Sequence, residues 1–248
     1  MTVDKELLEY LENMTEQEQE IIKNNRPVLS YFTKAEGCTV IDSDVVMKPM
    51  TMIDIMKQPR FVPLPDHTHN YMEIVYMGSG STTHVINKTT EITLAEDELL
   101  FLPQGTSHSV NSAGYRDIAI RFVILPEFLQ YPLSMLREDT VLRRFIEQAA
   151  EQKPSECPFL HFHIQDMPEA KNLLENMIRI LLHRRRNSRQ LLQATMGVLL
   201  LALSERTYMI TVGAPSSYEQ QLVLEALNYI ETHYKTATLA AFCENCRQ

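Results

Sequence analysis

The sequence lacks any hydrophobic segment long enough to cross a membrane. Its longest apolar run, residues 196–203, is far shorter than the roughly 18 residues that a membrane-spanning helix needs. It also lacks a start typical of a signal peptide, because the first 25 residues carry seven acids and only two lysines. These absences argue against a membrane protein and against a secreted one.

Cysteine is sparse, and basic charge is in deficit. Four cysteines without regular spacing in 248 residues do not suggest a disulfide framework, so a reducing cytoplasm is the expected location. Lys and Arg number 23 against 32 Asp and Glu, a formal charge of −9 at pH 7. Proteins that bind DNA usually present a basic surface. Any DNA-binding function must therefore rely on a local basic surface or on residues outside this chain.

The first half of the chain passes from a helical pattern to a strand pattern. An acidic amphipathic helix is expected over 4–24, in an N-terminal arm of residues 1–36 that would pack on the molecule or on a dimer partner. From about 38 to 125, short runs rich in Val, Ile, Thr and Phe are separated by turn signals such as GSG and PQG. Many short strands at this spacing predict a β-sandwich or barrel, which we place at 37–165.

Beyond Pro126 we expect one more strand, at 158–164, and then mainly helix. In that strand His161 and His163 share a face, and we expect that face to meet solvent rather than a metal ion. Helices over 167–186 and 188–208 would form an antiparallel hairpin in the segment 166–212. The hairpin could pack on the barrel or pair two subunits, and the sequence leaves both open.

Three further segments have simple interpretations. The basic run HRRRNSRQ at 183–190 falls at the tip of the expected hairpin, where a solvated loop is the simplest reading. Residues 213–217 have the composition of a linker. Cys243 and Cys246 form a CxxC pair without a second such pair or a nearby histidine pair, so we expect packed or edge cysteines rather than a zinc or redox site.

The stretch DHTHNYME at 66–73 contains the strongest candidate site. On a strand, His67, His69, Tyr71 and Glu73 share one face. A straight strand would place Glu73 roughly 13 Å from His69, too far for one ion to bridge. Chelation therefore requires the chain to turn between them, and Asn70 is a plausible pivot.

A further histidine can complete a ligand set with this stretch. His108 follows the turn formed by Pro103 and Gly105, so it could reach back from the returning strand. Three histidines and a carboxylate, from His67, His69, Glu73 and His108, suit a divalent transition metal such as Zn, Ni, Mn or Fe. A polar pocket without metal remains open.

These two segments resemble the two motifs of the cupin fold, a double-stranded β-helix barrel. HTHNYME followed by Gly80 resembles the first motif, and PQGTSH followed by Asn111 resembles the second. The glycines that open both motifs in that family are missing, the second falling within AEDE at 95–98. We interpret these losses as a relaxed constraint on the barrel geometry.

The tail LVLEALNYIETHYKTATLAAFCENC resembles the opening of the AraC-family DNA-binding domain. A cupin barrel, a helical hairpin and a linker ahead of it also follow the AraC-family order, and the resemblance covers about 57–248. Residues 218–248 would then be an incomplete helix-turn-helix domain, whose recognition helix is expected beyond Gln248. DNA would bind only the full-length protein, and no base-contacting residue can be named here.

The resemblance implies a ligand-responsive transcriptional regulator, acting as a homodimer, whose barrel binds a small effector. His67, His69, Glu73 and His108 would line the pocket, with Arg60 and Tyr71 as weaker candidates. Sugars are common effectors of similar proteins. No catalytic residue is assigned. The alternatives are a cupin metalloenzyme, either a dioxygenase or an isomerase, and a sugar-binding cupin without DNA.

Overall fold

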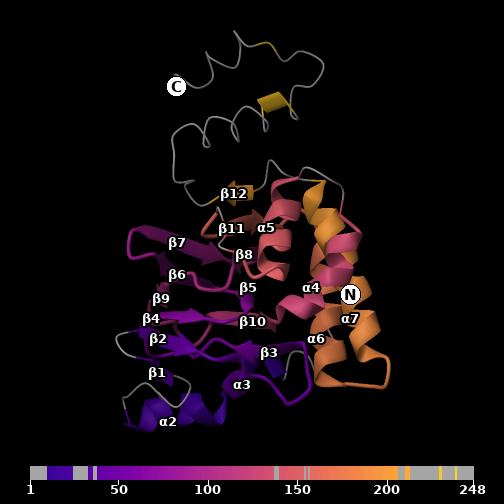
Figure 1. Ribbon diagram of the computed structural model, residues 1–248. Helices are drawn as coiled ribbons and strands as arrows, with labels where there is room; N and C mark the ends of the chain where they lie inside the picture. Colours follow the sequence, from indigo (N-terminus) through magenta and orange to yellow (C-terminus); the bar gives the residue numbers. More distant parts are fainter. Residues whose placement is uncertain are drawn as a thin grey trace.

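Two β-sheets lie face to face, and helices cover the outer face of one of them (Figure 1). The computed structural model describes residues 10–24, 33–35, 38–136, 140–153, 155, 157–205, 210–212, 229–230 and 238. This architecture is a cupin-like sandwich followed by a helical hairpin, which confirms the expected fold class. The expected helices over 218–248 and the CxxC pair lie outside the described residues, apart from 229–230 and 238.

In the described part of the chain each sheet has six strands. The first sheet has the order β1 (Thr33–Ala35), β2 (Cys38–Ile41), β4 (Leu64–His69), β9 (His108–Val110), β6 (Ser81–Ile86) and β7 (Thr90–Ala95). The second has the order β12 (Ile210–Val212), β11 (Leu160–His163), β8 (Glu98–Leu102), β5 (Met72–Ser79), β10 (Ile118–Ile124) and β3 (Ile53–Lys57). Among the described strands all pairings are antiparallel except that of β2 with β4. The connections therefore place β4 and β5, which are consecutive, in opposite sheets.

The second sheet is buried on both faces, which explains the continuous apolar runs of its central strands. Outward side chains such as Ile74, Leu99 and Phe122 join the large core beneath the helices. Inward ones such as Val75 and Leu100 join a second core between the sheets. The alternation along each strand thus separates a helix-facing face from a barrel-facing face.

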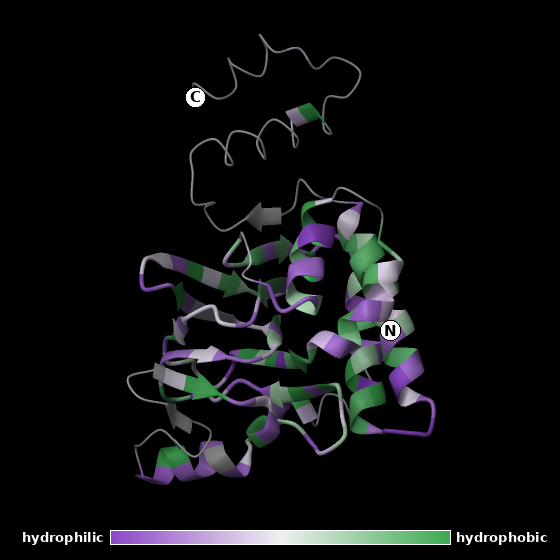
Figure 2. Ribbon diagram, in the orientation of Figure 1, coloured by the Kyte–Doolittle hydropathy of each residue, from purple (hydrophilic) through white to green (hydrophobic). Residues whose placement is uncertain are grey.

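Four helices stand against the outward face, as Figure 1 shows. These are α4 (Pro126–Ser134), α5 (Val141–Ala150), α6 (Pro168–Leu182) and α7 (Ser188–Ser204). Helices α6 and α7 form the expected hairpin, but α6 ends at Leu182 and not at 186. Figure 2 shows apolar residues interspersed with polar ones along these helices. Helices α4 and α5 were not expected, although α5 buries Leu142, Phe145 and Ile146 at helical spacing. None of the described helices is both long and apolar enough to span a membrane.

The expected single helix over 4–24 is wrong within the described residues. The chain is helical at 10–12, leaves that conformation at 13–15 and begins α2 (Glu16–Asn24). Thr15 Oγ1 accepts from Glu18 N at 3.2 Å, and Glu18 Oε2 accepts from Thr15 N at 2.7 Å. This reciprocal capping box satisfies two backbone donors at the start of α2 and favours a new helix there.

Two other expectations at the strand level are corrected. The first apolar run of the expected strand pattern, at 38–47, forms a strand only as far as Ile41. Asp42 then caps the short helix α3 (Ser43–Val46) by accepting from Asp44 N at 2.9 Å. Strand β12 was not expected, because three residues carry little periodicity. The basic hairpin tip is mainly exposed, as expected, but Arg184 is anchored to Asp54 Oδ1 at 2.9 Å.

Helix α2 is fixed to the barrel by a buried ion pair. Arg60 Nε donates to Glu18 Oε1 at 2.6 Å, and Arg60 Nη2 donates to Glu18 Oε2 at 2.9 Å. The two side chains are 3% and 1% exposed. Breaking a buried pair by removing one partner costs about 3–5 kcal/mol, because the remaining charge is left without compensation.

We therefore expect Glu18→Ala to lower the free energy of unfolding by about 3–5 kcal/mol, measured by urea denaturation. Glu16→Ala, at an exposed position in the same first turn, is the matched control and should cost under about 1 kcal/mol. Equal losses in the two variants would show that the ion pair contributes no specific stability.

Candidate functional site

The histidine–glutamate stretch bends between the two sheets. Strand β4 ends at His69 and β5 begins at Met72, so Asn70 and Tyr71 form the turn. Ser43 N donates to Asn70 Oδ1 at 2.9 Å, and Asn70 Nδ2 donates to Asp42 Oδ1 at 3.3 Å. The turn brings His69 Nε2 to 4.0 Å from Glu73 Oε2. The turn at Asn70 is therefore confirmed.

His108 reaches the same point from β9. The preceding turn uses Gly105 at a φ of 77°, a left-handed conformation that favours glycine. Gly105 N donates to His69 O at 2.9 Å, which fixes this turn against the end of β4. His108 Nε2 then lies 3.6 Å from Glu73 Oε2. His69, Glu73 and His108 thus bring three ligand atoms within 4.8 Å of one another.

His67 lies at the edge of this trio. It is the direct cross-strand partner of His108, and the two ring centroids are 4.2 Å apart. Its Nδ1 contacts Pro65 O at 2.8 Å, which orients the ring. His67 is therefore placed beside the trio, with its ring against that of His108.

Two charged or polar residues at the cluster were missed in the sequence. Arg121 on β10 is 5% exposed, and its Nη1 lies 3.5 Å from Glu73 Oε1. His84 on β6 is fully buried, contacts Thr82 Oγ1 at 3.1 Å and stacks near His108 with centroids 6.1 Å apart. The alternation of Thr82, His84 and Ile86 was the available signal, since it places all three on one face of β6.

The environment keeps the histidines neutral. Burial lowers the pKa of His67 and of His69 to about 4. The hydrogen bonds of His67 to Pro65 O and of His69 to Tyr71 O raise these pKa values, but burial has the larger effect. Burial likewise lowers the pKa of His84 to about 3 and that of His108 well below its usual value. Burial raises the pKa of Glu73, and the Arg121 charge opposes that rise. Neutral imidazole is the form that binds metal.

The ring orientation of His69 has a chemical consequence. Its Nδ1 lies 2.7 Å from Tyr71 O and must donate to that carbonyl, so the neutral ring carries its lone pair on Nε2. That lone pair faces Glu73 Oε2 at 4.0 Å. A lone pair facing a carboxylate is favourable only with a cation or a donor between them. A backbone carbonyl on the second ring nitrogen is also the usual support of a metal-bound histidine.

Several buried polar atoms at this cluster receive no hydrogen bond within the described part of the chain. They are both oxygens of Glu73, His69 Nε2, Tyr71 Oη, His84 Nδ1, His108 Nδ1 and Arg121 Nε. Burying a polar atom without a partner is costly. The separations of 3.6 and 4.0 Å around Glu73 Oε2 fit one ion between the ligands, since such ligands lie about 2.0–2.2 Å from zinc. The residues present therefore fit a metal ion.

The two weaker candidates take different positions. Tyr71 is fully buried, and its ring stacks on that of His69 with centroids 4.7 Å apart. Burial, together with the Glu73 charge, raises the pKa of Tyr71. The Arg60 guanidinium instead binds Glu18 and donates to Tyr115 O at 2.8 Å. Tyr71 thus lies at the cluster, whereas the charge of Arg60 is already neutralised on helix α2.

The expectation that His161 and His163 both face solvent is wrong for His161, whereas the His163 side chain is 41% exposed. His161 is 7% exposed, and its Nε2 lies 2.8 Å from Glu98 Oε2. His163 Nδ1 lies 2.7 Å from Glu98 Oε1. Their face of β11 is the barrel-facing one, because Leu160 and Phe162 occupy the helix-facing core.

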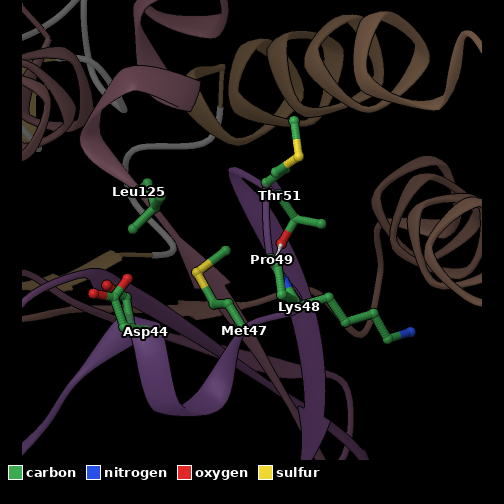
Figure 3. Close-up of a pocket in the computed structure, with 8 residues that line it drawn as sticks. Asp44, Met47, Lys48, Pro49, Thr51 and Leu125 are labelled. Carbon is green, nitrogen blue, oxygen red and sulfur yellow. Dashed lines mark hydrogen bonds between the residues drawn. The ribbon is translucent and has the colours of Figure 1, made fainter.

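A surface cavity of about 360 Å³ lies at one end of the barrel, between α3 and the start of α4. Its lining includes Asp44, Met47, Thr51 and Leu125, which Figure 3 shows around the opening. Met47 and Leu125 pack against the small buried cluster that contains Tyr71. This small cluster therefore contacts two residues of the cavity lining and, through Tyr71, the ring of His69.

Residues 58–201 match the AraC-like ligand-binding domain. The chain belongs to this family. The matched range contains the whole histidine–glutamate cluster, helix α6 and most of α7. The cluster therefore lies in a family's ligand-binding domain, which agrees with the chemistry of its unpartnered polar atoms.

The search among solved structures found remote similarities. Apo ToxT from Vibrio cholerae, a substituted variant, is 12% identical, with 79% of this chain and 70% of that chain covered and a TM-score of 0.47. ToxT with a bound unsaturated fatty acid is also 12% identical, with 79% and 68% covered and a TM-score of 0.43. Oxalate decarboxylase from Bacillus subtilis is 22% identical over 28% of this chain and 20% of its own, with a TM-score of 0.24. No curated protein sequence matches the chain.

Proposed function

We propose that this chain is the effector-sensing part of an AraC-family transcriptional regulator. The observation that carries the proposal is a buried cluster with unpartnered polar atoms inside the barrel of a ligand-binding domain. The resemblance of residues 218–248 to the start of a helix-turn-helix domain supports DNA as the partner of the full-length protein. Tight, salt-sensitive DNA binding by residues 1–248 alone would contradict this division of roles.

The barrel site binds a divalent transition-metal ion through His69, Glu73 and His108, with His67 as a fourth ligand or a neighbour. Zn, Ni, Mn and Fe suit this set of nitrogen and oxygen ligands. A bound ion would satisfy the His69 lone pair and the Glu73 carboxylate together. It would also supply a positive centre for a polar effector.

A small polar effector would meet both charge and hydrogen-bonding groups here. Arg121 offers a guanidinium that is only partly engaged by Glu73 at 3.5 Å, and Tyr71 offers a buried hydroxyl. The cluster members are 5% exposed or less, so an effector must enter through an opening motion. Such a motion links binding to a population shift between conformations, which is how an effector controls a distant DNA-binding domain.

The metal assignment predicts a loss of bound metal when two ligands are removed. After purification without chelators or a histidine tag, the His69→Ala, His108→Ala double variant should contain about one equivalent less metal per chain than the wild type, because Glu73 and His67 do not suffice to retain the ion. Elemental analysis measures this content, and His183→Ala, at an exposed site on the hairpin, is the control. Equal metal in all three proteins would exclude the barrel cluster as the site of the bound ion.

The hairpin is proposed to pair two subunits. Leu191 and Val198 lie one heptad apart on α7 and are 53% and 44% exposed, although both are large and apolar. Residues seven apart lie on the same side of a helix. This exposed stripe, opposite the face buried against the barrel, suits an isologous contact between two copies.

A charged pair on that stripe should prevent dimerisation. The Leu191→Glu, Val198→Glu variant should sediment as a monomer while the wild type sediments as a dimer, because like charges would face each other across the two-fold axis. Val45→Glu, an apolar residue equally exposed on α3, should remain dimeric. A wild type that is monomeric at all concentrations, or a variant that stays dimeric, would rule out this surface.

The alternative of a cupin metalloenzyme rests on the same cluster. An enzyme needs an open coordination position and a nearby acid or base. The family match over 58–201 favours the sensing role, and the barrel cluster serves either function with the same ligands.

A further inference from the structure

A second histidine–carboxylate cluster lies outside the barrel site, on strands β8 and β11. His163 is the direct cross-strand partner of Glu98 in an antiparallel pair. Direct partners point to the same side of a sheet, and His161 is two residues away on the same strand. All three side chains therefore leave the same face, and their ligand atoms lie within 4.8 Å of one another.

The carboxylate of Glu98 is held in place before any ion arrives. Ala95 N donates to Glu98 Oε2 at 2.9 Å, and Gln165 Nε2 donates to Glu98 Oε1 at 3.2 Å. The turn that leads into β8 is formed by Asp97 at a φ of 60°, a left-handed conformation that aspartate tolerates better than most residues. The segment AEDE at 95–98 is where the cupin motif has a glycine. Asp97 in this segment forms the turn without glycine, and Glu98 supplies the carboxylate.

We propose that Glu98, His161 and His163 form a second metal site, independent of the barrel, for a divalent transition-metal ion such as Zn²⁺. Two imidazole nitrogens and one carboxylate are a common protein ligand set for this ion, with water at the remaining position. The site is accessible, because the His163 side chain is 41% exposed whereas those of His161 and Glu98 are 9% and 8% exposed. An ion can therefore enter from solvent without opening the barrel.

The present distances describe the hydrogen-bonded form of the cluster. The imidazole nitrogens lie 2.8 and 2.7 Å from the Glu98 oxygens. Ligands around a tetrahedral zinc ion are about 3.4 Å apart, given bonds of about 2.1 Å. Ion binding must therefore widen the cluster by about 0.6–0.7 Å and move each ring proton to the other nitrogen. The half-exposed His163 ring has room for both changes.

An ion at this site would join two strands near the edge of the second sheet. Strand β11 pairs with β8 on one side and with β12 on the other. In Figure 1, β11 and β12 lie at the end of the sheet farthest from α2. The ion would therefore stabilise the edge of the sheet at which β12 pairs with β11. Loss of the ion should lower the thermal stability of the protein.

The test is zinc stoichiometry of the full chain, measured by equilibrium dialysis against Zn²⁺ followed by elemental analysis. His163→Ala should bind one equivalent less than the wild type, and His163→Asn should show the same loss. His183→Ala, the exposed control, should bind as much as the wild type. The His69→Ala, His108→Ala variant should still retain the equivalent that His163→Ala removes.

Thermal unfolding with and without Zn²⁺ gives a second readout. Zinc should raise the melting temperature of the wild type and of the barrel double variant, and this rise should be smaller in His163→Ala. Unchanged stoichiometry in both His163 variants would overturn the proposal and leave Glu98, His161 and His163 as a hydrogen-bonded structural network. Loss of zinc only in the barrel variant would also overturn it, while upholding the barrel metal site.

Discussion

The buried carboxylate of Glu73 is the constraint on which the barrel interior depends. A carboxylate removed from water needs compensating charge or hydrogen-bond donors. Here the surrounding groups are two neutral histidines, His69 and His108, and Arg121, at distances too long for direct hydrogen bonds to Glu73. The chain turns at Asn70 and again at Gly105 to bring these groups together. A cation or a polar ligand among these groups would supply the partner that the Glu73 oxygens and His69 Nε2 lack within the described residues.

The scaffold explains how such a site is kept rigid. The second sheet is packed on both faces, so each of its strands has little freedom to slide. Glu73 and Arg121 come from neighbouring strands of this sheet, whereas His69 and His108 come from the first. The site therefore joins the two sheets. A ligand that changes the spacing at Glu73 also acts on the sheet whose other face carries the helical hairpin.

The site was predictable where ligand chemistry and local spacing coincide. The distance argument for His69 and Glu73 required a turn, and Asn70 provides it. Arg121 and His84 escaped notice because they lie on separate strands, and only strand register places them inside the barrel. His161 and His163 share one face, as expected, but that face meets solvent at His163 and is covered at His161. The alternation of side chains along a strand assigns them to two faces of the sheet, but it does not show which face other elements cover.

The fold was predictable in its order and less so in its details. Repeated short strands and the two apolar helices indicated the barrel and the hairpin. The break before α2 depends on a reciprocal cap between Thr15 and Glu18, a short signal inside a longer amphipathic pattern. The missing glycine near residue 97 was interpreted as a relaxed geometry, yet Asp97 adopts the left-handed turn itself. A left-handed backbone conformation can thus be adopted by aspartate as well as by glycine.

We propose that a metal ion binds among His69, Glu73 and His108. The most direct measurement is anomalous diffraction at a metal absorption edge, from crystals of protein purified without chelators. We predict an anomalous peak between His69 Nε2, His108 Nε2 and Glu73 Oε2, at bonding distance from each. No peak there, with Glu73 instead hydrogen-bonded to its neighbours or to water, would contradict the claim.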